Sequence, residues 1–354
     1  MGINDELLDR AVSHQIGLQR LSRGVRDKLV AHLNRVEDDL LSQIRDRLDK
    51  GTFTDRRQRL VLRDIREILT EARPDGLEIV REEMRELASY EVDFQGRMIR
   101  DTLPVDINIR TPSREQLQSI VTSRPFQGRL LREWVEDLTN AQRRNMRDAI
   151  RIGMTEGETV DQITRRIRGT RAQGFRDGVM ETTRRQAQAM VRTAVNHTAT
   201  NARDLLYEQN DDLIKGWVFV ATLDTRTTET CASLDGQQFK VGEGPRPPRH
   251  PNCRSTTAPV TRSWEELGID LDEAPPGTRA SMDGQVPGKT TFNQWLRRQS
   301  ADRQAEALGS TKARLFREGN LSVDRFVDDA GKPYTLDELR RREASAFERA
   351  GIAA

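Results

Sequence analysis

The chain has 354 residues, of which 35% are hydrophobic and 32% are charged, with a formal net charge of +2 at pH 7. No apolar run approaches the roughly 20 residues of a membrane-spanning helix, so a membrane protein is excluded, and the lean composition favours elongated helical parts over one large globule. Two cysteines are too few for a disulfide-rich scaffold and fit a reducing compartment.

Residues 5–103 are predicted to form long amphipathic helices. The first carries an apolar stripe at three- and four-residue steps, made of Val25, Leu29, Leu33, Val36, Leu40, Ile44 and Leu48. Pro74 is expected to break the second helix, and a third is expected from about Leu77 to Leu103. Helices this polar are typical either of arms that complete their core against neighbours or of a self-contained bundle.

A helical middle region follows an extended connector between Pro104 and Pro112. Residues 150–169 have the sequence IRIGMTEGETVDQITRRIRG, in which two glycines make a turn and Thr159 caps a second helix. A helical hairpin fits this pattern, and a helix-turn-helix DNA reader is the alternative. A long helix is then predicted over about residues 178–209.

Residues 143–192 form the most basic window, with twelve arginines against six acidic residues. Such a window suits a phosphate backbone or an acidic partner, although the interspersed acids equally favour a salt-bridged helical surface. Few aromatic residues lie here, so stacking on single-stranded bases is not expected. The candidate contact residues for DNA or a partner are Arg143, Arg144, Arg147, Arg151, Arg165, Arg166, Arg168 and Arg171.

Residues 217–260, termed the Cys/His module, contain both cysteines, one of the four histidines and a Pro/Gly-rich loop. Strands are predicted over residues 217–223, 237–241 and 255–260. A short helix is expected around residues 228–234, with Asp224 as its cap. The module is therefore a small α+β element in an otherwise helical chain.

Cys231, His250 and Cys253 are the candidate ligands for a structural zinc, which needs four. His197, Asp224 and Asp235 are the candidates for the fourth. Two alternatives stay open, namely a Cys231–Cys253 disulfide or close thiol pair, and two unlinked buried residues.

Catalysis is not expected, and no residue is predicted to be catalytic. A zinc deaminase would need His-x-Glu and Cys-x-x-Cys motifs, which the sequence lacks. A nucleophilic pair of Cys253 and His250 has no evident third residue to orient it. A zinc-dependent enzyme acting on DNA is kept as the third hypothesis.

The order of motifs resembles a known family. The sequences IRIGMTEG at 150–157, RTAVN at 192–196, ATLDTRT at 221–227, CASLDG at 231–236 and HPNCR at 250–254 are similar to the phage Mu F-like minor head protein, or phage head morphogenesis, family. The resemblance covers about residues 126–260. Family members often carry two further cysteines, at positions where this chain has Thr228 and Ser255.

The resemblance implies a virion component that acts in head morphogenesis and is present in few copies. Its implied partners are the portal protein and the procapsid or major capsid protein, with DNA contact at packaging or ejection, no membrane contact, and host cytoplasm as the site of assembly. A nucleic-acid-binding module that uses the arginines of residues 143–192 is the alternative function.

The predicted fold class is mainly α with a small α+β part. We expect an elongated helical N-terminal region (1–112), a head morphogenesis domain (113–262) that includes the Cys/His module, a linker (263–289) and a small helical C-terminal tail (290–354). The C-terminal tail is expected to dock onto a partner.

Overall fold

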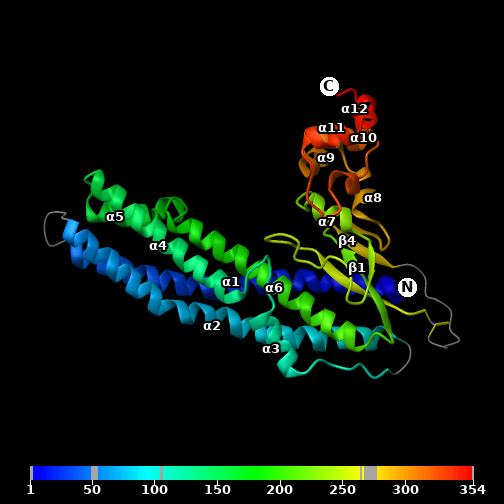
Figure 1. The fold of residues 1–354 in the computed structure, drawn as a ribbon, viewed down its shortest axis with the longest axis horizontal. Helices are drawn as coiled ribbons and strands as arrows, with labels where there is room; N and C mark the ends of the chain where they lie inside the picture. Colours follow the sequence, from blue (N-terminus) through cyan, green and yellow to red (C-terminus); the bar gives the residue numbers. More distant parts are fainter. Residues whose placement is uncertain (1–2, 49–54, 104–106, 264, 267–276, 353–354) are drawn as a thin grey trace. The chain divides into compact units, whose positions relative to one another are not determined.

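A computed structural model of the chain describes residues 3–48, 55–103, 107–263, 265–266 and 277–352 (Figure 1). It confirms the predicted fold class, since long helices precede a small sheet and short helices follow it. The long and middle helices are α1 (Ile3–Leu48), α2 (Asp55–Thr102), α3 (Arg114–Ser123), α4 (Leu131–Thr155), α5 (Val160–Arg168), the 3-10 turn η1 (Arg171–Gln173) and α6 (Met180–Gln209).

The elements that follow α6 are short. They are β1 (Ile214–Val220), α7 (Glu229–Leu234), β2 (Gln238–Lys240), β3 (Thr256–Thr261), β4 (Thr278–Ser281), β5 (Gly284–Pro287), α8 (Phe292–Arg297), α9 (Ala301–Leu308), α10 (Ser310–Arg317), η2 (Val323–Phe326), α11 (Leu336–Arg342) and α12 (Ala344–Arg349).

The chain divides into two compact units that interleave along the sequence. The sheet unit comprises residues 1–18, 90–113 and 199–354, and the bundle unit comprises residues 19–89 and 114–198. The helices α1, α2 and α6 each contribute residues to both units. The domain limits expected from the sequence stay a prediction.

The bundle unit is built around one apolar core. This core joins α1, α2, α4, α5 and the start of α6 through Val36, Leu40, Leu41, Ile44, Val61, Ile65, Leu69, Met146, Ala149, Ile150, Ile163, Ile167 and Met180. The predicted stripe of α1 therefore faces this core from Val36 to Ile44. Thr159 caps α5 as expected, because its side chain accepts a hydrogen bond from the Gln162 amide.

The predicted break at Pro74 is wrong, because α2 continues through this residue to Thr102. A proline inside a helix removes one backbone hydrogen bond and crowds the preceding turn. The neighbouring helix α1 packs closely against this part of α2, where the His32 ring forms a hydrogen bond with the Ala72 carbonyl at 3.1 Å. The same ring would lie 3.4 Å from a Cβ atom at Gly76. Packing against α1 thus overrides the local signal of the proline.

At Gly153, α4 packs tightly against α5. A Cβ atom at this position would lie 2.5 Å from the Ile163 side chain and 2.7 Å from Glu158. We therefore expect Gly153→Ala to overpack this contact and to lower the free energy of unfolding by about 1–3 kcal/mol, measured by urea denaturation. Gly24→Ala is the matched control, because nothing lies within 4 Å of its Cβ position. It should stabilise α1 by about 0.5–1 kcal/mol, and a neutral Gly153→Ala would contradict the prediction.

The sheet unit contains a three-stranded antiparallel sheet in the order β2-β1-β3. Its central strand begins three residues before the predicted start and places Trp217 opposite both Phe239 and Pro259. The N-terminal turns of α1 pack on this sheet, in a cluster that joins Leu8 and Ala11 to Val220 and Ala258. The first and last thirds of the chain thus share a core.

The C-terminal segments share an apolar core with the Cys/His module. The predicted linker contains the antiparallel hairpin β4-β5, while its residues 267–276 lie outside the described part of the chain. The core of the C-terminal helices includes Leu223 and Ala232 of the module, together with Phe292, Trp295, Leu296, Leu308, Leu315, Phe316 and Phe326. In the described residues, no helix is long and apolar enough to cross a membrane.

Candidate functional site

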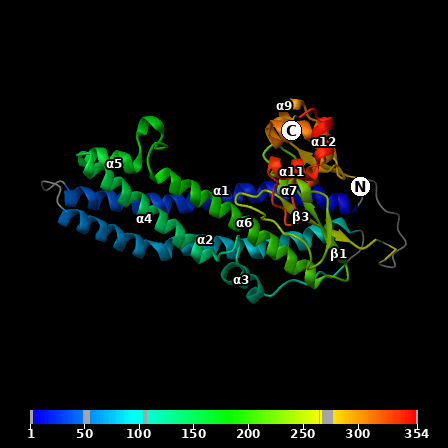
Figure 2. The same ribbon diagram turned by 45° about the horizontal axis from the view of Figure 1, so that its top comes forward.

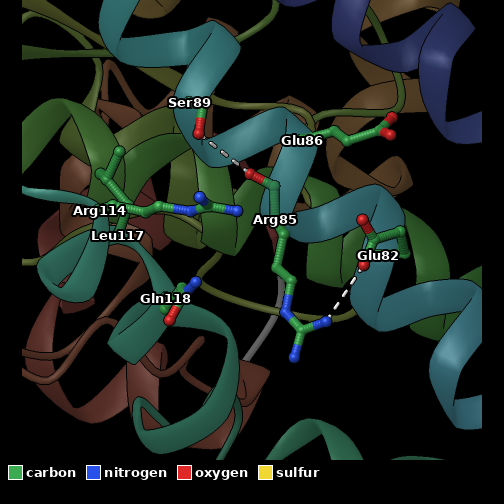
Figure 3. Close-up of a pocket in the computed structure, with 7 residues that line it drawn as sticks. All are labelled: Glu82, Arg85, Glu86, Ser89, Arg114, Leu117 and Gln118. Carbon is green, nitrogen blue, oxygen red and sulfur yellow. Dashed lines mark hydrogen bonds and ion pairs between the residues drawn. The ribbon is translucent and has the colours of Figure 1, made fainter.

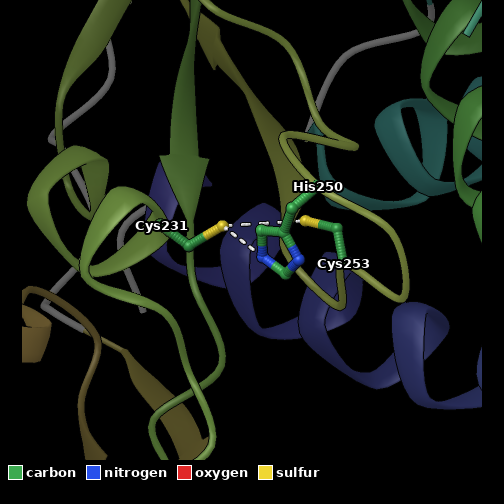
Figure 4. A group of neighbouring side chains, drawn as sticks. All are labelled: Cys231, His250 and Cys253. Atoms are coloured by element: carbon green, nitrogen blue, oxygen red, sulfur yellow. Dashed lines mark hydrogen bonds between the residues drawn. The ribbon is translucent and has the colours of Figure 1, made fainter. Parts of the chain in front are cut away.

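Three side chains of the Cys/His module meet at one point (Figure 4). Cys231 lies in the first turn of α7, which Thr228 caps by accepting a hydrogen bond from the Cys231 amide. The cap is therefore Thr228 and not Asp224. His250 and Cys253 come from the proline-rich loop before β3, where the Cys253 amide donates to the His250 carbonyl at 3.1 Å. This tight turn brings both loop residues to the same side.

The distances in this Cys/His cluster fit a tetrahedral metal ion. The ligand atoms of the three residues all lie within 4.8 Å of one another, with the Cys231 Sγ atom 3.7 Å from Cys253 Sγ and 3.3 Å from His250 Nε2. Two sulfurs bound at about 2.3 Å to a tetrahedral zinc are separated by about 3.8 Å, whereas a disulfide needs about 2.05 Å. The two cysteines are free thiols, and the Cys-His-Cys group could bind a metal.

The protonation of the cluster also suits metal binding. The ring nitrogen Nδ1 of His250 lies 2.9 Å from the Pro251 carbonyl oxygen, so it donates its hydrogen there and leaves Nε2 for a ligand. The hydrogen bond from Cys231 lowers the pKa of Cys253 well below its ordinary value, while the same pairing and burial raise the pKa of Cys231. These shifts favour the thiolate form at Cys253, and the thiolate is the form that binds metals.

A small cavity of about 30 Å³ adjoins the cluster. This space is large enough for a water molecule. Hydroxyl groups of Thr228 and Ser255 line it, at the two positions where the family resemblance places further cysteines. The cavity thus offers an oxygen ligand or a water for a fourth coordination position. Its lining consists of Thr222, Arg226, Thr227, Thr228, Cys231, His250, Asn252, Arg254 and Ser255.

The three predicted candidates for a fourth ligand are not members of the cluster. Asp224 forms an ion pair with Arg254 and thereby ties the turn after β1 to the loop that precedes β3. Asp235 is fully buried and pairs with Arg279. His197 packs against the Phe126 ring at 5.2 Å, and burial lowers its pKa to about 4.

The Asp235 carboxylate holds the C-terminal segments onto the module. It accepts hydrogen bonds from both terminal nitrogens of Arg279 at 3.1 and 3.2 Å and from the backbone amides of Ala221 at 2.7 Å and Phe292 at 2.6 Å. Arg279 also donates to the carbonyl oxygens of Ala221 and Thr290. One buried ion pair therefore joins the residues that directly follow β1 and α7 to β4 and α8.

A second buried network lies where the ends of the long helices meet the sheet. Glu91 of α2 forms an ion pair with Arg203 of α6, in which the carboxylate lies 2.7 Å from Nε, and it lies 2.6 Å from the Nε2 atom of His14 in α1. Arg203 continues to the β3 backbone, where it donates to the Thr257 carbonyl at 3.1 Å. Gln95 donates to the same carboxylate at 2.8 Å. Four elements of the sheet unit are thus held by one charge cluster.

Glu91, Arg203 and Arg279 are functional residues that no motif in the sequence singled out. A signal existed for Arg203, because it stands between Ala199 and Leu206 at helical spacing, on the buried face of α6. A charged residue at an inward position needs a partner of opposite charge. Sequence alone does not say which residue that partner is.

The predicted contact arginines all lie in the bundle unit, on α4, α5 and the turn after it. Several are neutralised there, since Arg147 pairs with Asp148, Arg166 with Glu156 and Glu158, and Arg168 with Asp38. The remaining members are exposed, and in the described part of the chain no ion pair is formed by Arg143, Arg144, Arg151, Arg165 or Arg171.

A larger hollow of about 210 Å³ lies between α2 and α3 (Figure 3). Two arginines line it, of which Arg85 is already paired with Glu78 and Glu82 and Arg114 is exposed. The lining residues are Glu82, Arg85, Glu86, Ser89, Arg114, Leu117 and Gln118. These residues offer no thiol, imidazole or unpaired buried charge that would define a chemistry, so we assign no function to this hollow.

Long helices and a small sheet module with a Cys-His-Cys cluster place this protein in the mainly α class. Residues 144–258 match the family model described as phage Mu protein F like protein. This match confirms the predicted resemblance and includes the whole Cys-His-Cys cluster. A Mu F-like domain indicates a phage head morphogenesis protein. No curated protein and no solved structure matches the chain.

Proposed function

We propose that this chain is a phage minor head protein that acts in head morphogenesis without catalysing a reaction. The observation that carries the proposal is the Mu F-like match over residues 144–258. The proposed partners are the portal protein and the procapsid or major capsid protein, and the proposed location is the virion, after assembly in the host cytoplasm. DNA contact at packaging or ejection is the finer part of the proposal.

The architecture supports an assembly role. The bundle unit presents long polar helix faces. The sheet unit is held together by buried ion pairs and by the apolar core of the C-terminal helices. The Cys/His cluster lies inside the sheet unit, where a bound metal would hold α7 and the loop before β3 together. The cluster therefore acts in this proposal as a structural staple.

The assembly role is tested by producing phage heads with and without the chain. Quantitative mass spectrometry of purified heads should detect a few copies per particle. We expect that heads assembled in its absence are malformed or fail to retain DNA. Normal, DNA-filled heads in the absence of the chain would contradict the proposal.

We further propose that the Cys/His cluster binds one zinc ion through Cys231, His250 and Cys253. Elemental analysis should find one zinc per chain, and both thiols should become reactive only after chelation. Zinc removal should lower stability by roughly 4 kcal/mol relative to protein at a free zinc concentration of 1,000 times Kd.

Two variants make the zinc prediction specific. Cys253→Ser should lose the metal, whereas His197→Gln should keep it, because His197 is not a member of the cluster. A protein with two reactive thiols and no zinc as purified would show that the three residues are ordinary packing. DNA-directed enzyme activity that disappears in a Cys253→Ala and His250→Ala double variant would instead favour the enzymatic alternative.

A nucleic-acid-binding role is the second candidate function. The exposed arginines of α4 and α5 that form no ion pair among the described residues favour it. Binding to DNA should then weaken steeply between low and moderate salt. The absence of any binding at low salt would exclude this role.

A further inference from the structure

The segment between α5 and α6 forms a closed loop, visible as the hook between these helices in Figure 2. The Asp177 carboxylate closes its neck by accepting hydrogen bonds from the amide and the hydroxyl of Thr170, both at 2.8 Å. Below the neck the two chain segments touch, because a Cβ atom on Gly178 would lie 2.3 Å from the Arg168 backbone. Residues 170–177, termed the neck-closed loop, are therefore held in a defined shape.

This loop presents an aromatic ring to solvent in an unfavourable backbone conformation. Phe175 has φ +62° and is 38% exposed. A bulky L residue rarely adopts the left-handed region, and such outliers concentrate at functional sites. The Arg168 guanidinium lies 5.5 Å from the ring centroid and is itself paired with Asp38 at 3.0 Å. The Phe175 ring is thus in contact with Arg168, which is itself held by Asp38 of α1.

Several arginines close to Phe175 in the sequence form no ion pair among the described residues. Arg171 and Arg176 lie in the neck-closed loop and Arg165 lies in the last turn of α5, and all three are exposed. Among the residues the structure describes, their side chains form no ion pair, in contrast to Arg166 and Arg168 nearby. The one acid of the loop, Asp177, is occupied by the neck hydrogen bonds. The surface therefore suits a polyanion more than a neutral protein face.

We propose that the neck-closed loop is a contact element for single-stranded nucleic acid. Phe175 stacks on one unpaired base, and Arg165, Arg171 and Arg176 contact the flanking phosphates. Because stacking needs an unstacked base, the partner is a single strand rather than a duplex. The low aromatic content of this window argued against stacking, but exposure and position make the single aromatic residue available. The proposal rests on the DNA contact proposed above and specifies it as base stacking by Phe175 with phosphate contacts by the arginines.

The test measures binding of the full-length protein to a fluorescent 20-mer oligodeoxythymidine over a salt series. Phe175→Ala should weaken binding roughly tenfold at every salt concentration, because stacking is not ionic. The Arg171→Gln and Arg176→Gln double variant should instead reduce the slope of log K against log salt by about 1.4, or about 0.7 per phosphate contact. Phe175→Trp should bind as well as the wild type, whereas Phe175→Leu should resemble Phe175→Ala.

Matched controls are available in the sheet unit. Met282 is 48% exposed and Arg298 is exposed, so Met282→Ala and Arg298→Gln should leave binding unchanged. Wild-type affinity in Phe175→Ala, with the salt dependence intact, would overturn the role of the loop but leave the arginine contact standing. No binding at low salt would overturn both.

The head-assembly role is judged separately, by incorporation of the same variants into phage heads. Loss of incorporation in Phe175→Ala with unchanged oligonucleotide binding would identify the loop as a protein contact and refute the nucleic-acid assignment. Normal incorporation with weakened binding is the result expected from the proposal.

Discussion

Replacement of Arg203 by methionine is expected to lower the free energy of unfolding by about 3–5 kcal/mol at pH 7. The substitution leaves the Glu91 carboxylate fully buried, with only His14 and Gln95 as partners. It also removes the link to β3. Urea denaturation followed by circular dichroism measures the loss. Arg298→Met is the matched control, since this arginine is exposed, and it should change stability by less than about 0.5 kcal/mol.

The pH dependence of the same variant gives an independent test. Burial alone raises the pKa of Glu91, but the charge of Arg203 and hydrogen bonds from His14 and Gln95 outweigh it and hold the pKa below its ordinary value of 4.5. A lowered folded pKa contributes stability that is present above pH 4.5 and is lost as the pH falls through the folded value.

Without Arg203 the burial effect dominates, and the pKa of Glu91 should rise above 4.5. The stability gap between wild type and Arg203→Met should therefore be largest near neutral pH and shrink as the pH falls toward 4. A Glu91→Gln and Arg203→Met double variant should lose less than the sum of the single losses. A gap that is constant with pH would show that Arg203 acts through packing and not through its charge.

Replacement of Asp235 by alanine is expected to detach the C-terminal segments from the Cys/His module. It removes four hydrogen bonds at once and leaves the Arg279 guanidinium buried without its counter-ion. The expected loss is about 3–5 kcal/mol. Limited trypsin digestion should then release fragments from the arginine-rich residues 277–352 at concentrations that leave the wild type intact.

Two further variants serve as an intermediate case and a control for the Asp235 prediction. Asp235→Asn keeps an acceptor for one backbone amide but loses the charge, so its loss should be intermediate. Asp329 is exposed, and Asp329→Ala should behave as the wild type. If Asp235→Ala resists trypsin as the wild type does, the C-terminal helices are held by their apolar core alone, through Leu223 and Ala232.

Local patterns in the sequence were enough to predict the helices and the small sheet. The apolar spacing of α1, the Thr159 cap of α5 and the alternation around Trp217 act over a few residues, so they are readable without tertiary information. The same holds for Cys231, His250 and Cys253, whose rarity and spacing singled them out. Pro74 shows the limit, because α2 continues through this proline where it packs against His32 of another helix, a contact that the local sequence does not reveal.

Sequence by itself determined the helical class, the resemblance to a phage head family and the identity of the metal-ligand candidates. Only the tertiary structure showed that the two thiols and the imidazole meet, and that Asp224 and Asp235 serve ion pairs instead of the Cys/His cluster. It also revealed the Glu91–Arg203 network and the exposure of Phe175. The physical reason is range, since propensity and periodicity act between near neighbours, whereas buried charges find partners more than 100 positions away in the chain.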